Sequence, residues 1–325
     1  MTVIRVYDVP NEFYAESTWI DGTSFFVYAS KTTGHHFNGT AYRGSVSSSD
    51  LVQSEIAWNH EENGTSAVGL SNQQGAVAFW SGYEYLVSCG GFCPRYRVWA
   101  DGSLGNERDG EPVAWSLDGT RLAVIHPISE NASTDSGSNI AEAGVNFNSG
   151  WLEVFSYPGL QSVYSNRDLV VDDIEPSFSP SGKYLLVESD HDEVVDLDHG
   201  TVTQSPSDWP TYWYGDDNLM GSNGDDLVER ALDGSVVGRW KAIGNFGFRT
   251  SPDGRLLVTA DDQRSPHTIE VIRDGQLLSF KLPDLVGLQG VDLIMPTPAD
   301  DGRSVVLLTE TPEHFGPLLV LRVPS

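Results

Sequence analysis

A turn-centred motif repeats along this chain, and it constrains the fold more than any other feature. Its clearest copy is Glu175–Asp190, EPSFSPSGKYLLVESD. Phe178 lies in a short apolar run, the Pro-Ser-Gly at 180–182 interrupts it, and Tyr184–Val187 form a second apolar run. Two short strands joined by a glycine-containing turn make a β-hairpin. The chain is therefore expected to be all-β and to consist of tandem hairpins.

Seven segments share this motif when they are aligned on the turn. They are Trp19–Ala29, Phe79–Ser88, Ala114–Ile125, Ser177–Ser189, Tyr212–Ser222, Arg249–Ala260 and Thr297–Glu310.

A second hairpin follows most of the first ones, usually with Asp-Gly or Asn-Gly at its turn. These dipeptides supply the positive φ that tight hairpin turns need. Four strands in each unit, repeated four to eight times, are typical of a β-propeller. A β-sandwich, the alternative fold, would have fewer strands and no fixed motif. The second hairpins are expected at Ile56–Val68, Tyr96–Leu104, Trp151–Tyr164, Val194–Thr203, Leu227–Trp240 and Thr268–Leu282.

The two ends of the chain each leave a unit incomplete. The last unit, which ends in PLLVLRVPS, has three strands, and the N-terminal strand TVIRVYDV precedes the first unit without a partner. We therefore predict one domain, residues 1–325: a seven-bladed β-propeller of four-stranded antiparallel blades. The N-terminal strand is expected to join the last blade and close the ring.

The turn motif also suggests a family resemblance. Ser-Pro-Ser-Gly at 179–182 and Ser-Pro-Asp-Gly at 251–254 each precede an apolar strand, and Glu-Pro at 111–112 and 175–176 precedes two of the turns. This pattern resembles the repeats of TolB-type and WD-like bacterial propellers. The resemblance covers most of the chain, although a Trp-Asp pair at the strand ends is absent. Because one fold supports many functions, it implies a binding platform at most.

Three connections are longer than the minimal blade requires. With the strands of a blade named a to d from the centre outwards, these are b–c connections, expected on the same face as the d–a connections, the top face. Loops on a rigid scaffold often carry function, although surface insertions are also tolerated without one. The three ranges are 31–54, 89–94 and 127–150.

Acidic residues gather at the predicted top face, either just before strand a or at the end of strand b. A ring of carboxylates would hold a divalent cation such as calcium or meet a basic peptide. The alternative is that these are solvated strand ends of an acidic protein. The candidate ligand-binding residues are Glu111, Glu175, His126, Asp190, Asp261 and Glu310.

The overall charge narrows the choice of partners. The net charge is −27, with 46 acidic residues against 19 Lys and Arg. Such a surface repels nucleic acid and anionic membranes and attracts basic proteins, although solubility or a salty medium would also explain the acidity. No apolar run is long enough for a transmembrane helix, and MTVIRVYDVP does not resemble a signal peptide. We expect a monomer without membrane insertion, cytoplasmic by default.

The two cysteines, Cys89 and Cys93, form a C-x3-C loop. A disulfide between them would close few residues and contribute little stability. Idle thiols are the other expectation. Half a metal site with His35 or His36 is less favoured, because zinc usually takes four ligands and a C-x2-C spacing.

The sequence contains none of the common nucleophile, zinc-protease or nucleotide-binding motifs. The predicted function is a non-enzymatic platform, without a cofactor, that binds a protein or basic peptide on its acidic top face. One alternative is a propeller lyase or hydrolase with a metal at the channel mouth, held by Glu111 and Glu175. The other is a carbohydrate-binding propeller that stacks sugars on Trp209, Trp213 and Tyr214.

Overall fold

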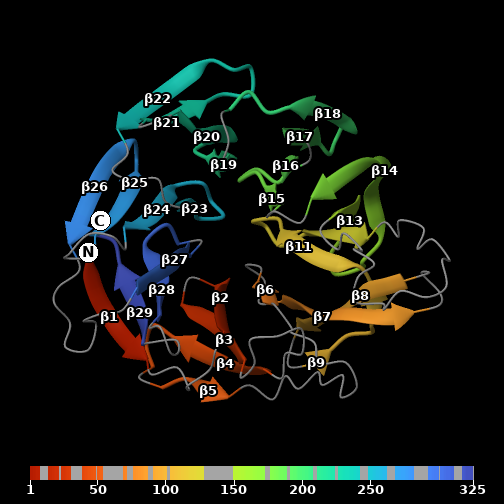
Figure 1. The fold of residues 1–325 in the computed structure, drawn as a ribbon, viewed down its shortest axis with the longest axis horizontal. Helices are drawn as coiled ribbons and strands as arrows, with labels where there is room; N and C mark the ends of the chain where they lie inside the picture. The colour runs from red at the N-terminus through yellow and green to blue at the C-terminus, as the bar shows by residue number, and fades with distance from the viewer. Residues whose placement is uncertain are drawn as a thin grey trace, which may run out of the picture.

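The computed structural model forms a ring of seven antiparallel sheets around a central axis (Figure 1). In the described part of the chain every regular element is a β-strand, and no helix there is long and apolar enough to cross a membrane. The prediction of a seven-bladed β-propeller with four-stranded antiparallel blades is confirmed. The structure describes residues 1–7, 14–21, 23–30, 39–48, 50–53, 69–71, 76–86, 91–100, 103–127, 149–172, 176–188, 191–207, 211–223, 226–241, 248–261, 268–281, 292–299, 301–310 and 317–324.

The first three blades follow the chain order from the centre outwards. In blade 2 the outer strand is divided into two short pieces that both pair with β8. Blade 1 contains β2 (Tyr14–Asp21), β3 (Ser24–Ser30), β4 (Gly39–Ser45) and β5 (Val52–Gln53); blade 2 contains β6 (Gly69–Ser71), β7 (Val77–Leu86), β8 (Gly91–Ala100), β9 (Ser103–Leu104) and β10 (Arg108–Asp109); blade 3 contains β11 (Glu111–Trp115), β12 (Arg121–Pro127), β13 (Ser149–Ser156) and β14 (Ser162–Asp172).

Blades 4 to 6 repeat the same four-stranded pattern. Blade 4 contains β15 (Ser177–Phe178), β16 (Tyr184–Glu188), β17 (Asp192–Asp196) and β18 (Thr201–Gln204); blade 5 contains β19 (Thr211–Tyr214), β20 (Asn218–Asn223), β21 (Asp226–Arg230) and β22 (Val236–Lys241); blade 6 contains β23 (Phe248–Thr250), β24 (Leu256–Asp261), β25 (Thr268–Arg273) and β26 (Gln276–Lys281).

Blade 7 combines the two ends of the chain. Its strands are β27 (Asp292–Pro298), β28 (Ser304–Glu310) and β29 (Leu318–Arg322), with β1 (Thr2–Tyr7) as the outer strand. β1 runs antiparallel to β29, from Thr2 opposite Arg322 to Tyr7 opposite Leu318. Both ends of the chain therefore lie at this blade (Figure 1), and the predicted closure by the N-terminal strand is confirmed.

The repeated Ser-x-Asp-Gly motif forms the a–b turns. In blade 6 the Ser251 hydroxyl donates to the Asp253 carboxylate, and the same hydroxyl oxygen accepts the Leu256 amide at 3.0 Å. Gly254 adopts a φ of 68°, a conformation that side chains rarely take. The Ser116 and Asp118 side chains make the same bond in blade 3. Serine and aspartate recur because their side chains form the hydrogen bonds of this turn, and glycine recurs because it adopts the positive φ that the turn requires.

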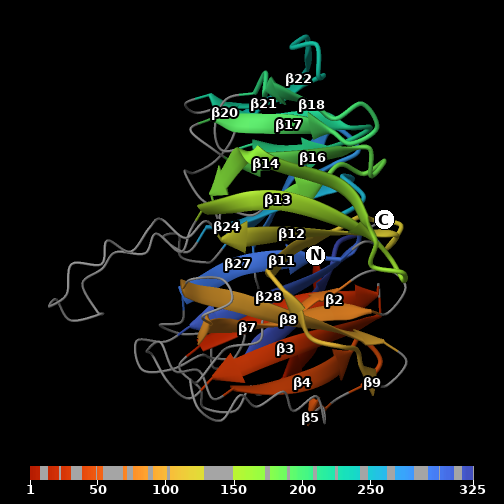
Figure 2. The same ribbon diagram turned by 90° about the vertical axis from the view of Figure 1, so that its right-hand side faces the viewer.

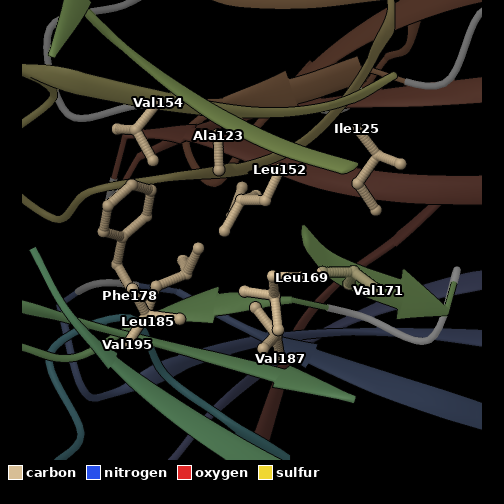
Figure 3. Packing of buried hydrophobic residues seen from close by; sticks show 11 residues of the cluster. Ala123, Ile125, Leu152, Val154, Leu169, Val171, Phe178, Leu185, Val187 and Val195 are labelled. Carbon is tan, nitrogen blue, oxygen red and sulfur yellow. The ribbon is translucent and has the colours of Figure 1, made fainter. Parts of the chain in front are cut away.

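Apolar side chains fill the seven junctions between neighbouring blades, one cluster at each junction. Figure 3 shows the junction of blades 3 and 4, where Ala123 and Leu152 face Phe178, Leu185 and Val187. Full burial of one such side chain contributes about 1.5–3 kcal/mol. The core is therefore distributed around the ring, and each blade depends on both neighbours.

Tryptophan side chains add hydrogen bonds across these junctions. The Trp19 indole of blade 1 donates to the Thr297 carbonyl of blade 7, and the Trp213 indole of blade 5 donates to the Ser177 carbonyl of blade 4, each at 2.8 Å. Trp213 is 2% exposed, so water does not replace its bond readily.

We therefore predict that Trp213→Phe lowers the free energy of unfolding by about 2–3 kcal/mol, because it removes buried volume and leaves the Ser177 carbonyl without its donor. Trp240→Phe is the matched control. The Trp240 indole donates to the exposed Gly275 carbonyl at 3.0 Å, and water can take its place. Urea denaturation measures both variants. Equal losses in the two would show that the buried bond has no special role.

The structure corrects two of the three predicted insertions. The range 31–54 contains β4 and β5, so it includes strands c and d of blade 1 and is not a single b–c connection. The range 89–94 overlaps β8, which begins at Gly91. Neither GTAYRGS nor Val52–Gln53 has the apolar run by which strands were recognised. The third range does connect strand b to strand c, and residues 128–148 lie outside the described residues.

The expected hairpin at Phe79–Ser88 is also wrong. Residues 79–86 of this segment belong to the single strand β7, whose pairing with β8 shifts between Ser81 and Glu84. The Ser-Gly pair at 81–82 therefore lies in a strand irregularity, while strand a of blade 2 is β6. The hairpin expected at Ile56–Val68 lies outside the described residues.

Candidate functional site

The strands run between the two faces of the ring (Figure 2). At the top face strands a and c begin and strands b and d end, so the charges of the strand ends can be compared directly. The top ends carry many carboxylates, whereas several bottom ends carry arginine. The acidic residues at the top are Glu111 and Asp292 at the start of strand a, Asp192 and Asp226 at the start of strand c, Glu188, Asp261 and Glu310 at the end of strand b, and Asp109 and Asp172 at the end of strand d, where Lys241 and Lys281 also stand. The charged residues at the bottom ends are Arg121, Arg230, Arg273 and Arg322, together with Asp21 and Asp196.

The predicted site residues differ in their burial and in the blade to which they belong. Glu111 opens β11 but is only 8% exposed, so it is not a surface carboxylate. His126 lies near the end of β12, beside Ile125, which pairs with Glu111. Asp261 and Glu310 end strand b in blades 6 and 7. The structure thus places Glu111 and His126 on neighbouring strands of blade 3, and Asp261 and Glu310 in other blades.

Other predicted residues lie beyond the described part of the chain. Glu175, Asp190 and Cys89 are outside the described residues. Cys93 lies in β8, and its side chain is not described. Within the described residues, no group of three or more His, Cys, Asp or Glu side chains is arranged to hold a metal ion.

A polar and aromatic group, the His126 cluster, occupies the top of blade 3 where it meets blade 2. It consists of His126, Trp151 and Glu153. The His126 ring stacks on the Trp151 ring with centroids 4.1 Å apart and an interplanar angle of 17°. Its Nε2 lies 2.9 Å from Oε2 of Glu153. Because a carboxylate only accepts, the Nε2–H of the imidazole donates this hydrogen bond.

Strand register creates the cluster. His126 pairs with Trp151 across β12 and β13, and Val124 pairs with Glu153, so these side chains share one face of the blade. Val124 packs in the cluster between blades 2 and 3, which shows that this face points towards blade 2. Sequence reasoning selected His126 but missed Trp151 and Glu153. Their alternation along strand c is the signal that could have identified them.

The electrostatics of His126 reflect its burial. The side chains of His126 and Glu153 are 17% and 15% exposed. Burial lowers the pKa of His126 below its ordinary value, and the Glu153 carboxylate opposes that shift. Asp109 also raises this pKa, whereas Arg167 lowers it; the Arg167 guanidinium lies 5.0 Å from the centre of the Trp151 ring.

Tyr96 of blade 2 faces the same junction. It is fully buried, and its hydroxyl has no hydrogen-bond partner among the described residues. Burial raises the pKa of Tyr96 to about 12, so the hydroxyl stays neutral; Arg108 lowers this pKa, and Glu153 and Asp109 raise it.

Some acidic groups of the bottom turns serve their own turns. Asp118 accepts from the Ser116 and Thr120 hydroxyls at 2.6 and 2.8 Å. Asp301 accepts from the Ser304 hydroxyl at 2.7 Å. Their hydrogen bonds are local, so these carboxylates shape the turn and do not identify a binding site.

Comparisons with known proteins support the fold. No protein-family model matches the chain, and no curated protein matches it significantly. The chain is similar to a chain in the crystal structure of the mitotic checkpoint complex, with a TM-score of 0.57 and 10% identity over 100% of this chain and 96% of that one. It is also similar to the C-terminal WD40 domain of Sif2, with a TM-score of 0.52 and 13% identity over 100% of both chains.

A third similar structure is Sqt1 from Chaetomium thermophilum, with a TM-score of 0.52 and 12% identity over 99% of this chain and 98% of that one. Identities this low show the fold alone. They support the resemblance to WD-like propellers, while the resemblance to TolB-type repeats rests on the turn motifs.

Proposed function

We propose that this propeller is a non-enzymatic platform that binds a basic protein or peptide at its top face. The observation that carries the proposal is the charge polarity of the blades. Acidic residues outnumber basic ones at the top ends of the strands, whereas arginines outnumber acidic residues at the bottom ends. A general role in protein interactions also agrees with the structural neighbours, one of which is part of a protein complex.

The top face is the better candidate for the binding surface, because aspartates of the bottom face are used in hydrogen bonds within their own turns. There, aspartates such as Asp118 and Asp301 are engaged inside tight turns. At the top, the residues that end strand b in three blades are Glu188, Asp261 and Glu310. They hold the same place in the blade, so the acidic character follows the repeat. Acidic residues that recur in three blades suit an extended cationic partner.

Charge of this kind acts mainly on the rate of association. A net charge of −27 attracts cationic partners over a distance of about one Debye length, roughly 8 Å at physiological salt. Attraction to the whole protein would not select a face, whereas strand-end carboxylates at the top would orient the partner there. The association rate should therefore fall as salt rises, and it should depend on where the charges lie.

The test compares two triple variants with the same net charge. The top variant carries Glu188→Gln, Asp261→Asn and Glu310→Gln. The bottom variant changes aspartates in the c–d turns of blades 4, 5 and 6: Asp198→Asn, Asp233→Asn and Asp274→Asn. Binding of a pool of labelled lysine- and arginine-rich peptides is measured by fluorescence anisotropy at several salt concentrations.

We expect the top variant to bind the peptides about tenfold more weakly and the bottom variant to stay within about twofold of the parent. Circular dichroism confirms that both variants are folded. Equal losses of affinity in the two variants would show that only the net charge matters and would contradict a binding site at the top face. A parent protein that binds none of the peptides would overturn the proposal.

A further inference from the structure

His126 is placed where three parts of the structure meet. Its ring stacks on Trp151 of β13, donates to Glu153 of the same strand, and lies against Gly110, which connects blade 2 to blade 3. Gly110 adopts a φ of 112°. A methyl group added to it would lie 2.4 Å from Cγ1 of Val124 and 3.2 Å from both Nδ1 and Cε1 of His126, so Val124 and the histidine ring together fill the space beside this connection.

The two ring nitrogens have different surroundings. Nε2 donates to Glu153, while Nδ1 and Cε1 lie nearest to the position that a Cβ atom on Gly110 would take. The described residues give His126 no hydrogen bond besides the one with Glu153. A second proton would have to be placed on Nδ1, beside Gly110, in a setting that is four-fifths shielded from water. A buried charge of this kind costs free energy unless it gains a partner.

The neighbouring charges do not remove this cost. Glu153 of β13 and Asp109 of β10 favour the protonated imidazole, and Arg167 of β14 disfavours it. From blade 2, Arg108 and the neutral Tyr96 hydroxyl also act at this junction. Glu153 already accepts the Nε2–H, so the added proton at Nδ1 gains no hydrogen bond from it. The imidazolium is better solvated if the ring leaves the space between Trp151 and Gly110.

We infer that the His126 cluster is an acid-sensitive lock between blades 2 and 3, closed while the imidazole is neutral and opened when Nδ1 takes a proton. In the closed form the ring holds the top ends of β12 and β13 against the connection from blade 2. In the open form the ring is exposed and its stack with Trp151 is lost. The device belongs to the propeller itself and does not require the proposed peptide-binding function.

The direction of the pH dependence follows from linkage. The pKa of His126 is lower in the closed junction than in the open one, where the ring has its ordinary pKa of 6.5. The lock is therefore fully stable above pH 6.5, and it weakens as the pH falls from 6.5 to the lowered value. The stability of the closed form decreases by at most about tenfold in equilibrium constant for each pH unit in this window.

The chain contains a matched control with the opposite sign. His199 in the c–d turn of blade 4 also pairs with a carboxylate, its Nδ1 lying 2.9 Å from Oδ2 of Asp196. Its side chain is 77% exposed, and the hydrogen bond with Asp196 raises the pKa of His199. Acid should therefore leave that turn closed.

The experiment follows the pH titration of the histidine ring carbons by NMR and amide hydrogen exchange corrected for intrinsic rates, in the parent and in His126→Gln. The His126 signal is identified by its absence from the variant. Glutamine can still donate to Glu153 but does not titrate. We expect His126 to titrate below pH 6.5 and His199 above it.

Between pH 7 and pH 5, protection of the amides at Ile125 and Leu152 should fall by up to about tenfold per pH unit in the parent and stay constant in His126→Gln. The amides around His199 should keep their protection in both proteins. The inference is overturned if His126 titrates at or above pH 6.5, or if the parent and His126→Gln lose protection equally.

Discussion

Replacing Gly254 by alanine is expected to lower the free energy of unfolding by about 3–5 kcal/mol, among the largest effects of a single methyl group in this chain. Gly254 lies in the a–b turn of blade 6 and has a φ of 68°. Its added Cβ would lie 2.8 Å from the Pro180 ring of blade 4 and 2.9 Å from the Gly215 carbonyl of blade 5. Neither neighbour is a flexible side-chain end, so the methyl group can be accommodated only if turns of three blades move apart.

The movement would also break a hydrogen bond between blades. The Gly215 amide donates to the Gly254 carbonyl at 2.8 Å, directly beside the added methyl group. The expected loss therefore combines overpacking, backbone strain and a weakened hydrogen bond, each worth about 1 kcal/mol or more.

Gly275→Ala separates these contributions. Gly275 has nearly the same φ, 72°, but nothing lies within 4 Å of its added Cβ. We expect it to cost only about 1 kcal/mol, the price of the left-handed backbone alone. Thermal and urea denaturation of both variants give the comparison. Equal losses would mean that the close approach of the three turns does not contribute to stability.

The blade number and the closure were predictable because their signals are local. Ser-x-Asp-Gly stands at the a–b turns of blades 3 and 6, and related sequences with glycine or aspartate stand at those of blades 1, 4, 5 and 7. In blade 6 the serine, the aspartate and the glycine all act within the turn itself. Closure followed from counting, because the chain has one strand too few at its end and one too many at its start. Neither inference needs a distance between parts of the chain that are remote in sequence.

The strands of blades 1 and 2 were harder to predict, because the sequence of each segment alone fits more than one structure. The Ser-Gly pair at 81–82 has turn composition, yet β7 continues through it with a shift in register. β4 contains two glycines, an alanine, a serine and an arginine, so its composition does not distinguish it from a loop. In both places the pairing with neighbouring strands decides the structure, and that pairing is not encoded in the segment alone.

Some features of the candidate site could also be predicted from the sequence, and others could not. Acidic strand ends could be predicted, because a residue's place at the end of a strand is a local property. The bond of His126 with Glu153 could not, since it depends on the register of β12 and β13 across a long connection. The burial of Glu111 was missed for a related reason: its neighbours belong to other strands.

The ring closure itself gives the second large prediction. β1 is the one strand of blade 7 that comes from the other end of the chain, and it covers the edge of β29. The fully packed Tyr7 anchors its end, and the Tyr7 hydroxyl donates to the carbonyls of Ser45 and Ser48 in blade 1. β1 therefore ties blade 7 to blade 1 as well as completing its own sheet.

Deletion of residues 1–7 should therefore lower the melting temperature by roughly 10 °C or more, because it removes a ladder of backbone hydrogen bonds and exposes the edge of an apolar strand. A synthetic peptide with the sequence of residues 1–7 should restore part of the loss when added in excess. Val3→Ser and Val6→Ser test the same strand without truncation. Val3 packs against the core between blades 6 and 7, whereas Val6 is 49% exposed, so only the first should be clearly destabilising. A truncated protein that melts like the parent, together with equal effects of the two serine variants, would show that β1 does not close the ring in solution.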